Sequence, residues 1–268
     1  MQTIRYRPRT DQKYPARYRA GQAALLLGLC LTAQMVQAAR PAGMGFSFSR
    51  VVLMEEKRGG ASVAVVNNTD NVYLMQSRIQ AADIPSGMPV DTAKGAPPPP
   101  FVVLPPLQRI EAHGELPLRI MVTPDNRLPT DRESVFFLTT KAIPSVSPMK
   151  AAADDKGGRV VLALANSIKL FYRPTGLKDN ALGEASKQLT VQQADNAVRI
   201  TNPSPYYITF ASLSVNGKAL NADVLRRMVP PRSSQTYPLP AGITGGDVRW
   251  RVIDEYGLNT DEQHAALR

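Results

Sequence analysis

Frequent turn residues are the feature that most constrains the fold of this chain. Glycine, proline, asparagine and aspartate interrupt the apolar segments at short intervals, which leaves no room for a long helix. The segments between them are rich in β-branched and aromatic residues, which favour strands. Many short strands are typical of a β-sandwich or barrel. The clearest strand-like segments are 46–53, 59–70, 71–80, 116–124, 133–144, 159–173, 187–193, 196–202, 206–217, 234–239 and 247–257.

Two further segments differ from this pattern. Residues 219–228, ALNADVLRRM, are the one helix candidate, with room for one or two turns. The proline-rich segment 96–115, APPPPFVVLPPLQRIEAHGE, cannot lie inside a sheet. We interpret it as a loop that enters a strand at 101–104, and a polyproline interaction motif is the alternative.

The first 38 residues have the pattern of an export signal. Residues 1–19 hold six basic residues and one acid, and an apolar run follows from Ala23 to Val36. Val36 and Ala38 suit the −3 and −1 positions of a signal-peptidase site, so we predict cleavage after Ala38. The apolar run is too short to favour a membrane span, so no stable membrane insertion is expected.

About 230 residues then remain, which suits two domains of ordinary size. We place them at 39–173 and 174–268, because Pro174 ends the long strand-like segment. One larger all-β domain is the alternative on length alone.

Cysteine usage and charge exclude several classes of protein. Cys30 is the only cysteine and lies in the leader, after Leu29, which is too large for a lipoprotein site. The mature chain therefore has no disulfide and no cysteine chemistry. Removing the leader lowers the net charge from +10 to about +5. This charge is spread along the chain, so no nucleic-acid partner is expected.

The sequence has no pattern of an enzyme site. His113 and His264 are far apart and lack the neighbours of a zinc site, so we predict no metal. Phosphate-binding and dinucleotide-binding glycine motifs are missing, so we predict no cofactor. Glu133 precedes a strand and is the one candidate acid, but no partner for it is evident. We therefore predict that the protein is not an enzyme.

The segment 159–173, RVVLALANSIKLFYR, is apolar on both faces at its beginning. Side chains alternate along a strand, so Val160, Leu162 and Leu164 share one face. Two interpretations remain open on composition alone. The strand is central and buried on both faces, or it is an edge strand that offers its apolar row to another protein.

At SIKLFYRP (167–174) the sequence resembles the signature of the periplasmic pilus (fimbrial) chaperones. Further segments match that family in order: PPLQRIEAHG, LPTDRESVFFLTTKAIP, NPSPYYITF, PPRSSQTY and VIDEYG. The resemblance spans about residues 44–257. It implies an all-β fold of two immunoglobulin-like β-sandwich domains at an angle with an inter-domain cleft.

The resemblance also implies the function. Members of this family bind, fold and cap pilus subunits in the periplasm by donor-strand complementation, and they deliver the subunits to an outer-membrane usher. A structural pilus component or adhesin is the alternative, but that class has a cysteine pair and a single incomplete sandwich. Exposure of an apolar donor row also predicts self-association of the free chaperone.

Residue roles follow from the same resemblance. Arg50 and Lys169 would bind the C-terminal carboxylate of the subunit, because two fixed cations give charge-assisted hydrogen bonds to it. The donor row for the subunit groove would be Val160, Leu162 and Leu164. Lys169 is at an odd-numbered position, whereas the row occupies even-numbered ones. Lys169 would therefore point to the other face of the strand, toward the cleft.

A buried inter-domain ion network is the last feature that the resemblance implies. Glu133 and Arg173 match two of its members. The third is an aspartate in the family, whereas this chain reads Asp254-Glu255, so Glu255 takes that place and Asp254 is the alternative. The connection 145–159 has no cysteine pair, which favours the branch of the family with a short loop.

Overall fold

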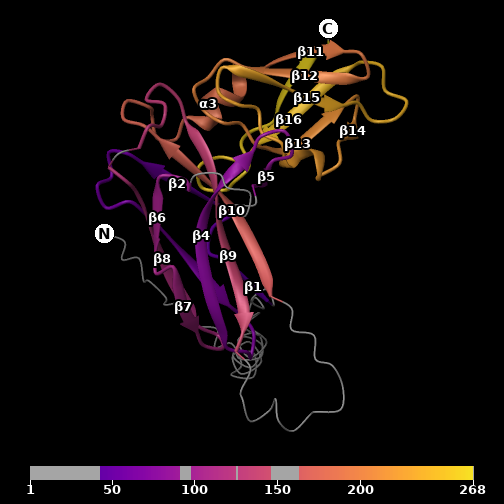
Figure 1. Ribbon diagram of the computed structural model, residues 1–268. Coiled ribbons are helices and arrows are strands. Elements are labelled where there is room, and N and C mark those ends of the chain that lie inside the picture. Colours follow the sequence, from indigo (N-terminus) through magenta and orange to yellow (C-terminus); the bar gives the residue numbers. More distant parts are fainter. Residues whose placement is uncertain (1–42, 91–97, 125, 146–162, 268) are drawn as a thin grey trace, which may run out of the picture. The chain divides into compact units, whose positions relative to one another are not determined.

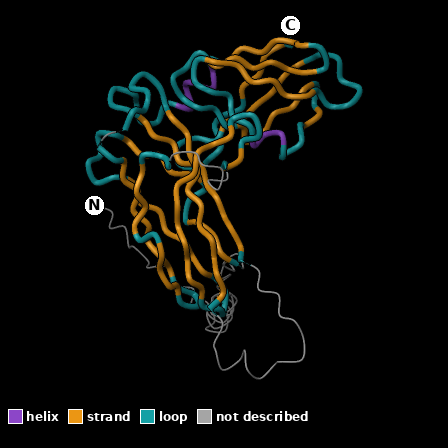
Figure 2. Tube along the Cα trace, in the orientation of Figure 1, coloured by secondary structure: helices purple, strands orange, loops and turns teal. Residues whose placement is uncertain are grey.

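The computed structural model describes residues 43–90, 98–124, 126–145 and 163–267, and these form two β-sandwiches that follow one another along the chain (Figures 1 and 2). The fold class predicted from the turn pattern is therefore observed. Across these described ranges, no helix has the length and apolar character that crossing a membrane would need. The predicted signal peptide and the connection 146–159 lie outside the described residues.

The first sandwich consists of two sheets. One has the order β1-β3-β8-β6, and the other has the order β2-β10-β9-β4-β5, with β7 paired to β4. Its strands are β1 (Met44–Phe46), β2 (Arg50–Met54), β3 (Ala61–Asn67), β4 (Tyr73–Asp83), β5 (Met88–Pro89), β6 (Phe101–Leu104), β7 (Leu107–Ile110), β8 (Glu115–Val122), β9 (Ser134–Pro144) and β10 (Leu164–Arg173).

The core of this sandwich follows from alternation along the strands. In β10, Ile168, Leu170 and Tyr172 are buried and face the apolar side chains of the opposite sheet, such as Leu118 and Ile120 of β8. Alternate residues of a strand point to opposite faces, so Lys169, Phe171 and Arg173 lie on the other face of the same sheet.

The second sandwich has the sheets β11-β12-β15 and β14-β13-β16-β17. Its core includes Trp250 and Tyr237, and the Trp250 indole donates a hydrogen bond to the Ser186 carbonyl at 3.1 Å. The elements are α3 (Leu182–Lys187), β11 (Thr190–Ala194), β12 (Ala197–Asn202), β13 (Phe210–Val215), β14 (Lys218–Ala219), η2 (Val224–Arg226), β15 (Ser233–Pro238), β16 (Asp247–Val252) and β17 (Gln263–Ala266).

Local structure differs from the sequence prediction at several places. Strand β7 lies within the proline-rich segment interpreted as a loop, and β17 follows the last predicted strand. Segment 46–53 is not one strand, because the chain leaves one sheet at Phe46 and joins the other at Arg50. The predicted helix at 219–228 is only the three-residue 3₁₀ turn η2, whereas the α-helix of the second sandwich is α3. Helix α3 is too short for a periodic apolar pattern, so its sequence carries little signal.

Candidate functional site: two cations beside a strand edge

Strand β10 changes its pairing along its length. Residues Lys169–Tyr172 lie between β9 on one side and Arg50–Leu53 of β2, in parallel, on the other. Residues 164–168 pair with β9 alone within the described part of the chain. Among the described residues the strand is therefore central at one end and an edge at the other.

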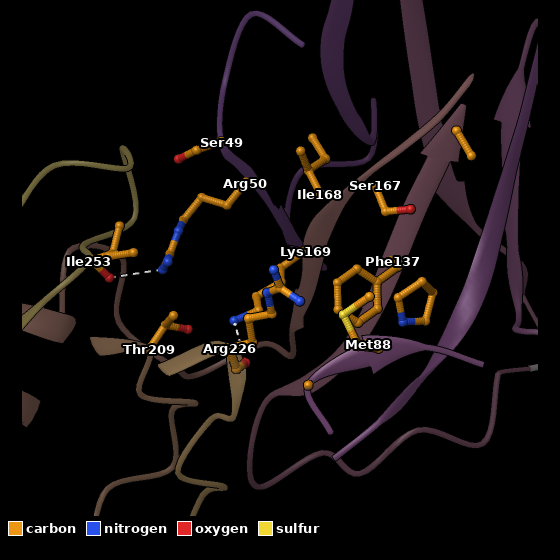
Figure 3. Close-up of a pocket in the computed structure, with 13 residues that line it drawn as sticks. Ser49, Arg50, Met88, Phe137, Ser167, Ile168, Lys169, Thr209, Arg226 and Ile253 are labelled. Carbon is orange, nitrogen blue, oxygen red and sulfur yellow. Dashed lines mark hydrogen bonds between the residues drawn. The ribbon is translucent and has the colours of Figure 1, made fainter. Parts of the chain in front are cut away.

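This pairing brings together Arg50 and Lys169, the two residues predicted to bind the subunit carboxylate (the carboxylate anchor). Lys169 of β10 and Arg50 of β2 are direct Cα partners, although 119 positions of sequence separate them. Figure 3 shows both side chains on the same side of the sheet, each reaching toward the backbone of the second sandwich. Arg50 lies against the face of Phe171, with Cζ 5.4 Å from the ring centre.

Arg50 is almost completely buried, with 5% of its surface exposed. Its Nη1 donates to the Ile253 carbonyl at 2.8 Å, whereas its buried Nε finds no hydrogen-bond partner among the described residues. Burial lowers the pKa of Arg50 to about 10, although the charges of Glu133, Asp254 and Glu255 oppose this shift. The guanidinium is therefore charged at neutral pH and retains an unused donor.

Lys169 is partly buried, and its Nζ donates to the Arg226 carbonyl at 3.1 Å. Burial and the positive charge of Arg50 lower the pKa of Lys169 to about 7. An anion placed between the two cations would reverse this effect, because an opposite charge favours the charged form of a lysine.

The two cations line a pocket of about 440 Å³. Its polar side chains include Ser49, Ser167 and Thr209, and its apolar ones include Met88, Pro89 and Phe137 (Figure 3). The lining comes from both sandwiches. A pocket with two cations, apolar walls and an adjacent strand edge suits the end of an extended chain that carries a carboxylate.

The structure also brings Glu133, Arg173 and Glu255 together. Arg173, which is fully buried, donates from Nε to Glu133 Oε1 at 2.8 Å and from Nη1 to Glu255 Oε1 at 3.1 Å. Burial disfavours its charge, but the two carboxylates outweigh burial and raise the pKa of Arg173. Asp254 has a different place, since its carboxylate accepts the N–H groups of Tyr256 and Leu258.

Each carboxylate of this cluster has a second hydrogen-bond partner in the second sandwich. Glu133 Oε2 accepts the Tyr207 N–H at 2.8 Å, and Glu255 Oε1 accepts the Ala181 N–H at 2.8 Å, at the start of α3. The Arg173 guanidinium also lies over the Tyr206 ring, 4.6 Å from its centre. The cluster thus connects the end of β10 to three segments of the second sandwich.

Of the predicted donor row, only Leu164 lies among the described residues, at the start of β10 with 64% of its surface exposed. Val160 and Leu162 lie outside the described part of the chain. Leu164 lies on the same face of β10 as Ile168 and Leu170, so it continues the core face of the first sandwich beyond its buried part.

The histidines do not contribute to this site. His113 Nε2 lies 2.8 Å from Asp70, and His264 Nδ1 lies 3.6 Å from Asp247. In the described ranges there is no group of three or more potential metal ligands. Sequence reasoning missed the carbonyl groups of Arg226 and Ile253, because every residue has a carbonyl and no residue type marks it.

Two family models match the chain. The pili and flagellar-assembly chaperone model, PapD N-terminal domain, matches residues 43–178, and the pili assembly chaperone PapD C-terminal domain matches residues 184–264. The chain with these two sandwiches thus belongs to a class of assembly chaperones, and the proteins of this class are not enzymes. The chain is a member of the PapD-like pilus-assembly chaperone family.

Individual relatives agree with this assignment. The chaperone protein FimC of Escherichia coli K12 is 33% identical over 248 residues, which are 91% of this chain and 92% of that protein. The chaperone protein LpfB of Salmonella typhimurium is 34% identical over 224 residues, which are 82% of this chain and 87% of that protein.

Solved structures show the same fold. The E. coli chaperone DraB superposes with a TM-score of 0.68 at 32% identity, covering 85% of this chain and 98% of that one. A second match is to the Salmonella enterica SafA pilin in complex with the SafB chaperone, with a TM-score of 0.68 at 29% identity. It covers 86% of this chain and 99% of the matched chain.

Proposed function

We propose that this protein is a periplasmic chaperone that caps pilus subunits by lending them the first part of β10, and that it hands them to an outer-membrane usher. One observation carries the proposal: two adjacent cations, Arg50 and Lys169, lie at the inner end of a strand edge that, among the described residues, pairs on one side only. A bound subunit strand would pair with this edge and end with its carboxylate at the cations. SafB, a chaperone of matching fold, is in complex with a pilin.

The proposed chemistry is binding without a covalent step. Main-chain hydrogen bonds along residues 164–168 supply affinity that does not depend on subunit sequence. The row Val160, Leu162 and Leu164 fills the subunit groove, and each side chain contributes roughly 1.5–3 kcal/mol when fully buried. The carboxylate fixes the register of the subunit strand, because it ends that strand at a defined point.

The proposal also includes a signal peptide at residues 1–38, followed by domains at 39–173 and 174–268.

The test of this function is capture of a subunit. The tagged protein should co-purify from the periplasm with a pilus subunit encoded in the same genome, and mass spectrometry should identify that subunit. Recovery of the tagged protein in purified surface fibres, with no subunit bound in the periplasm, would instead support a structural pilus component.

The donor row makes a separate prediction. Leu164→Asp should reduce subunit capture by about 30-fold or more, because a charge cannot enter the apolar groove without losing its hydration. The matched control is Leu258→Asp, since Leu258 has the same exposed fraction of 64% in a loop of the second sandwich. Equal capture by both variants would contradict the donor role of Leu164.

We also expect the free protein to associate through this row. Sedimentation at increasing protein concentration should show dimers, because the exposed row and strand edge can pair with a second copy. Leu164→Asp should shift the protein toward the monomer, whereas Leu258→Asp should not. A strictly monomeric wild-type protein at high concentration would contradict this expectation.

The pH dependence of carboxylate binding follows from Lys169. The probe is a synthetic peptide of alternating valine and threonine with a lysine start, made with a free C-terminal carboxylate (the acid peptide) or an amidated end (the amide peptide). The pKa of Lys169 is about 7 in the free protein, and a bound carboxylate favours its charged form. Above pH 7, binding must therefore take up a proton, so affinity for the acid peptide should fall by up to about tenfold per pH unit.

Below about pH 6.5 the affinity should be constant, because Lys169 is already protonated and a terminal carboxylate stays ionised down to about pH 4. The charged residues that line the pocket beside Lys169 are Arg50 and Arg226, and the Arg226 side chain pairs with Asp223 at 2.8 Å. The amide peptide and a Lys169→Arg variant are the controls. An acid-peptide affinity that does not change between pH 6 and 9 would contradict the prediction.

A further inference from the structure

The hairpin between β4 and β5 forms one wall of the carboxylate pocket. Gly87, Met88 and Pro89 are among the residues that line the pocket, and Figure 3 shows Met88 beside Phe137. Hydrogen bonds hold this hairpin: Gly87 N–H donates to the Asp83 carbonyl at 2.8 Å, and Ser86 N–H donates to the Asp83 carboxylate at 3.1 Å. The hairpin is therefore held to the first sandwich by hydrogen bonds within its turn and by the pairing of β5 with β4.

The tip of this hairpin lies directly against the backbone of the second sandwich. Gly87 has φ +69°, a conformation that side chains with a Cβ rarely adopt. A Cβ at this position would overlap the Arg226 carbonyl and would lie 2.8 Å from the Arg227 nitrogen. These are backbone atoms, so the overlap could not be relieved by rotating a side chain.

The backbone that Gly87 touches is the same backbone that holds Lys169. The Arg226 carbonyl, which any Cβ at position 87 would meet, accepts the hydrogen bond from Lys169 Nζ at 3.1 Å. The backbone at Arg226 and Arg227 is also attached to the core of the second sandwich, since the Tyr237 hydroxyl donates a hydrogen bond to the Arg227 carbonyl at 3.1 Å. Met228 follows and is fully buried against Val135 and Phe171 of the first sandwich.

We propose that Gly87 is a positioning residue for the carboxylate anchor: its missing side chain lets the hairpin close on η2 and so fixes the carbonyl that directs the Lys169 ammonium into the pocket. The proposal rests on the proposed carboxylate-binding function and deepens it. Any side chain at position 87 would separate the hairpin from η2, move the Arg226 carbonyl away from Lys169 and admit water to the pocket.

The chain offers a matched control for the backbone conformation. Gly242 has φ +75°, and an added Cβ there would meet no atom within 4 Å. Asparagine tolerates positive φ, as Asn180 and Asn216 do in this protein at +53° and +48°. Gly87→Asn and Gly242→Asn therefore share the conformational cost, and only the first creates the overlap with η2.

The experiment measures the ratio of acid-peptide to amide-peptide affinity for wild type and both variants, in full-length mature protein, with Gly87→Ala as a second, smaller variant at the site. We expect Gly87→Asn to reduce this ratio by about tenfold or more, and Gly242→Asn to leave it within about twofold of wild type. We also expect the pH above which acid-peptide affinity falls to move upward from about 7 in Gly87→Asn, because hydration of Lys169 raises its pKa toward 10.5.

Each other outcome has a definite meaning. A wild-type ratio near one would overturn the carboxylate anchor itself, and this proposal with it. A normal wild-type ratio that Gly87→Asn leaves unchanged, or an unchanged pH dependence, would overturn the role of Gly87 alone. Failure of both Gly87 variants to fold would also overturn it, because Gly87 would then support the junction as a whole and not the anchor.

Discussion

Lys169→Ala should abolish capture of a co-expressed pilus subunit while the chaperone itself remains folded and soluble. Loss of one partner from a buried, hydrogen-bonded charge pair costs about 2–5 kcal/mol of binding free energy, which is about 30-fold or more in affinity. Arg50→Ala should have a comparable effect, because Arg50 supplies the second cation and an Nε donor that has no partner among the described residues. The measurement is affinity for the acid peptide, together with subunit recovery from the periplasm.

The thermal stability of Lys169→Ala distinguishes a loss of carboxylate binding from misfolding. Folding lowers the pKa of Lys169 from 10.5 to about 7, so between these pH values the unfolded chain binds the proton more strongly. The charge of Lys169 therefore opposes folding at pH 7 and below. We expect Lys169→Ala to leave the thermal midpoint unchanged or raise it. A variant that loses both subunit capture and stability would contradict the anchor role.

Arg173→Ala should give the largest loss of stability of any substitution considered for this protein. It would leave Glu133 and Glu255 facing each other without the cation that both contact. Breaking a buried ion pair by removing one partner typically costs about 3–5 kcal/mol. Denaturant unfolding should show this loss as a lower midpoint, and subunit capture should fall because both β10 and the pocket depend on the junction.

The control for this prediction is another ion pair between the two sandwiches. Arg232 Nη1 lies 2.6 Å from Asp131, but both side chains are about half exposed. Exposed pairs contribute about 0–1 kcal/mol, so Arg232→Ala should have little effect on unfolding. If Arg173→Ala cost no more than Arg232→Ala, the Glu133–Arg173–Glu255 cluster would not be a major source of stability.

Much of the site could be predicted because strand geometry is local. Alternation along SIKLFYRP is enough to separate Lys169 from the apolar row and to place Arg173 on the same face as Lys169. The family resemblance then assigned roles to these residues, and the family itself is confirmed by the matches to both of its domains. The roles of Arg50, Lys169 and the donor row stay predictions.

Other parts of the site could not be predicted. The choice between Asp254 and Glu255 was open because both carboxylates are adjacent in sequence. In the structure Asp254 accepts the N–H groups of its own turn, and Glu255 reaches Arg173 and the start of α3. Only the path of the backbone through that turn decides which side chain points inward.

The sequence by itself determined the all-β class and the face of β10 that carries each side chain, since these depend on frequent turn residues and on alternation along a strand. The tertiary structure decided that, among the described strands, β10 is central at one end and an edge at the other, and that Arg50 lies beside Lys169. It also decided that Gly87 meets the Arg226 carbonyl. These contacts join residues far apart in the chain, and several involve backbone atoms, which are the same in nearly every residue and leave no mark in a sequence.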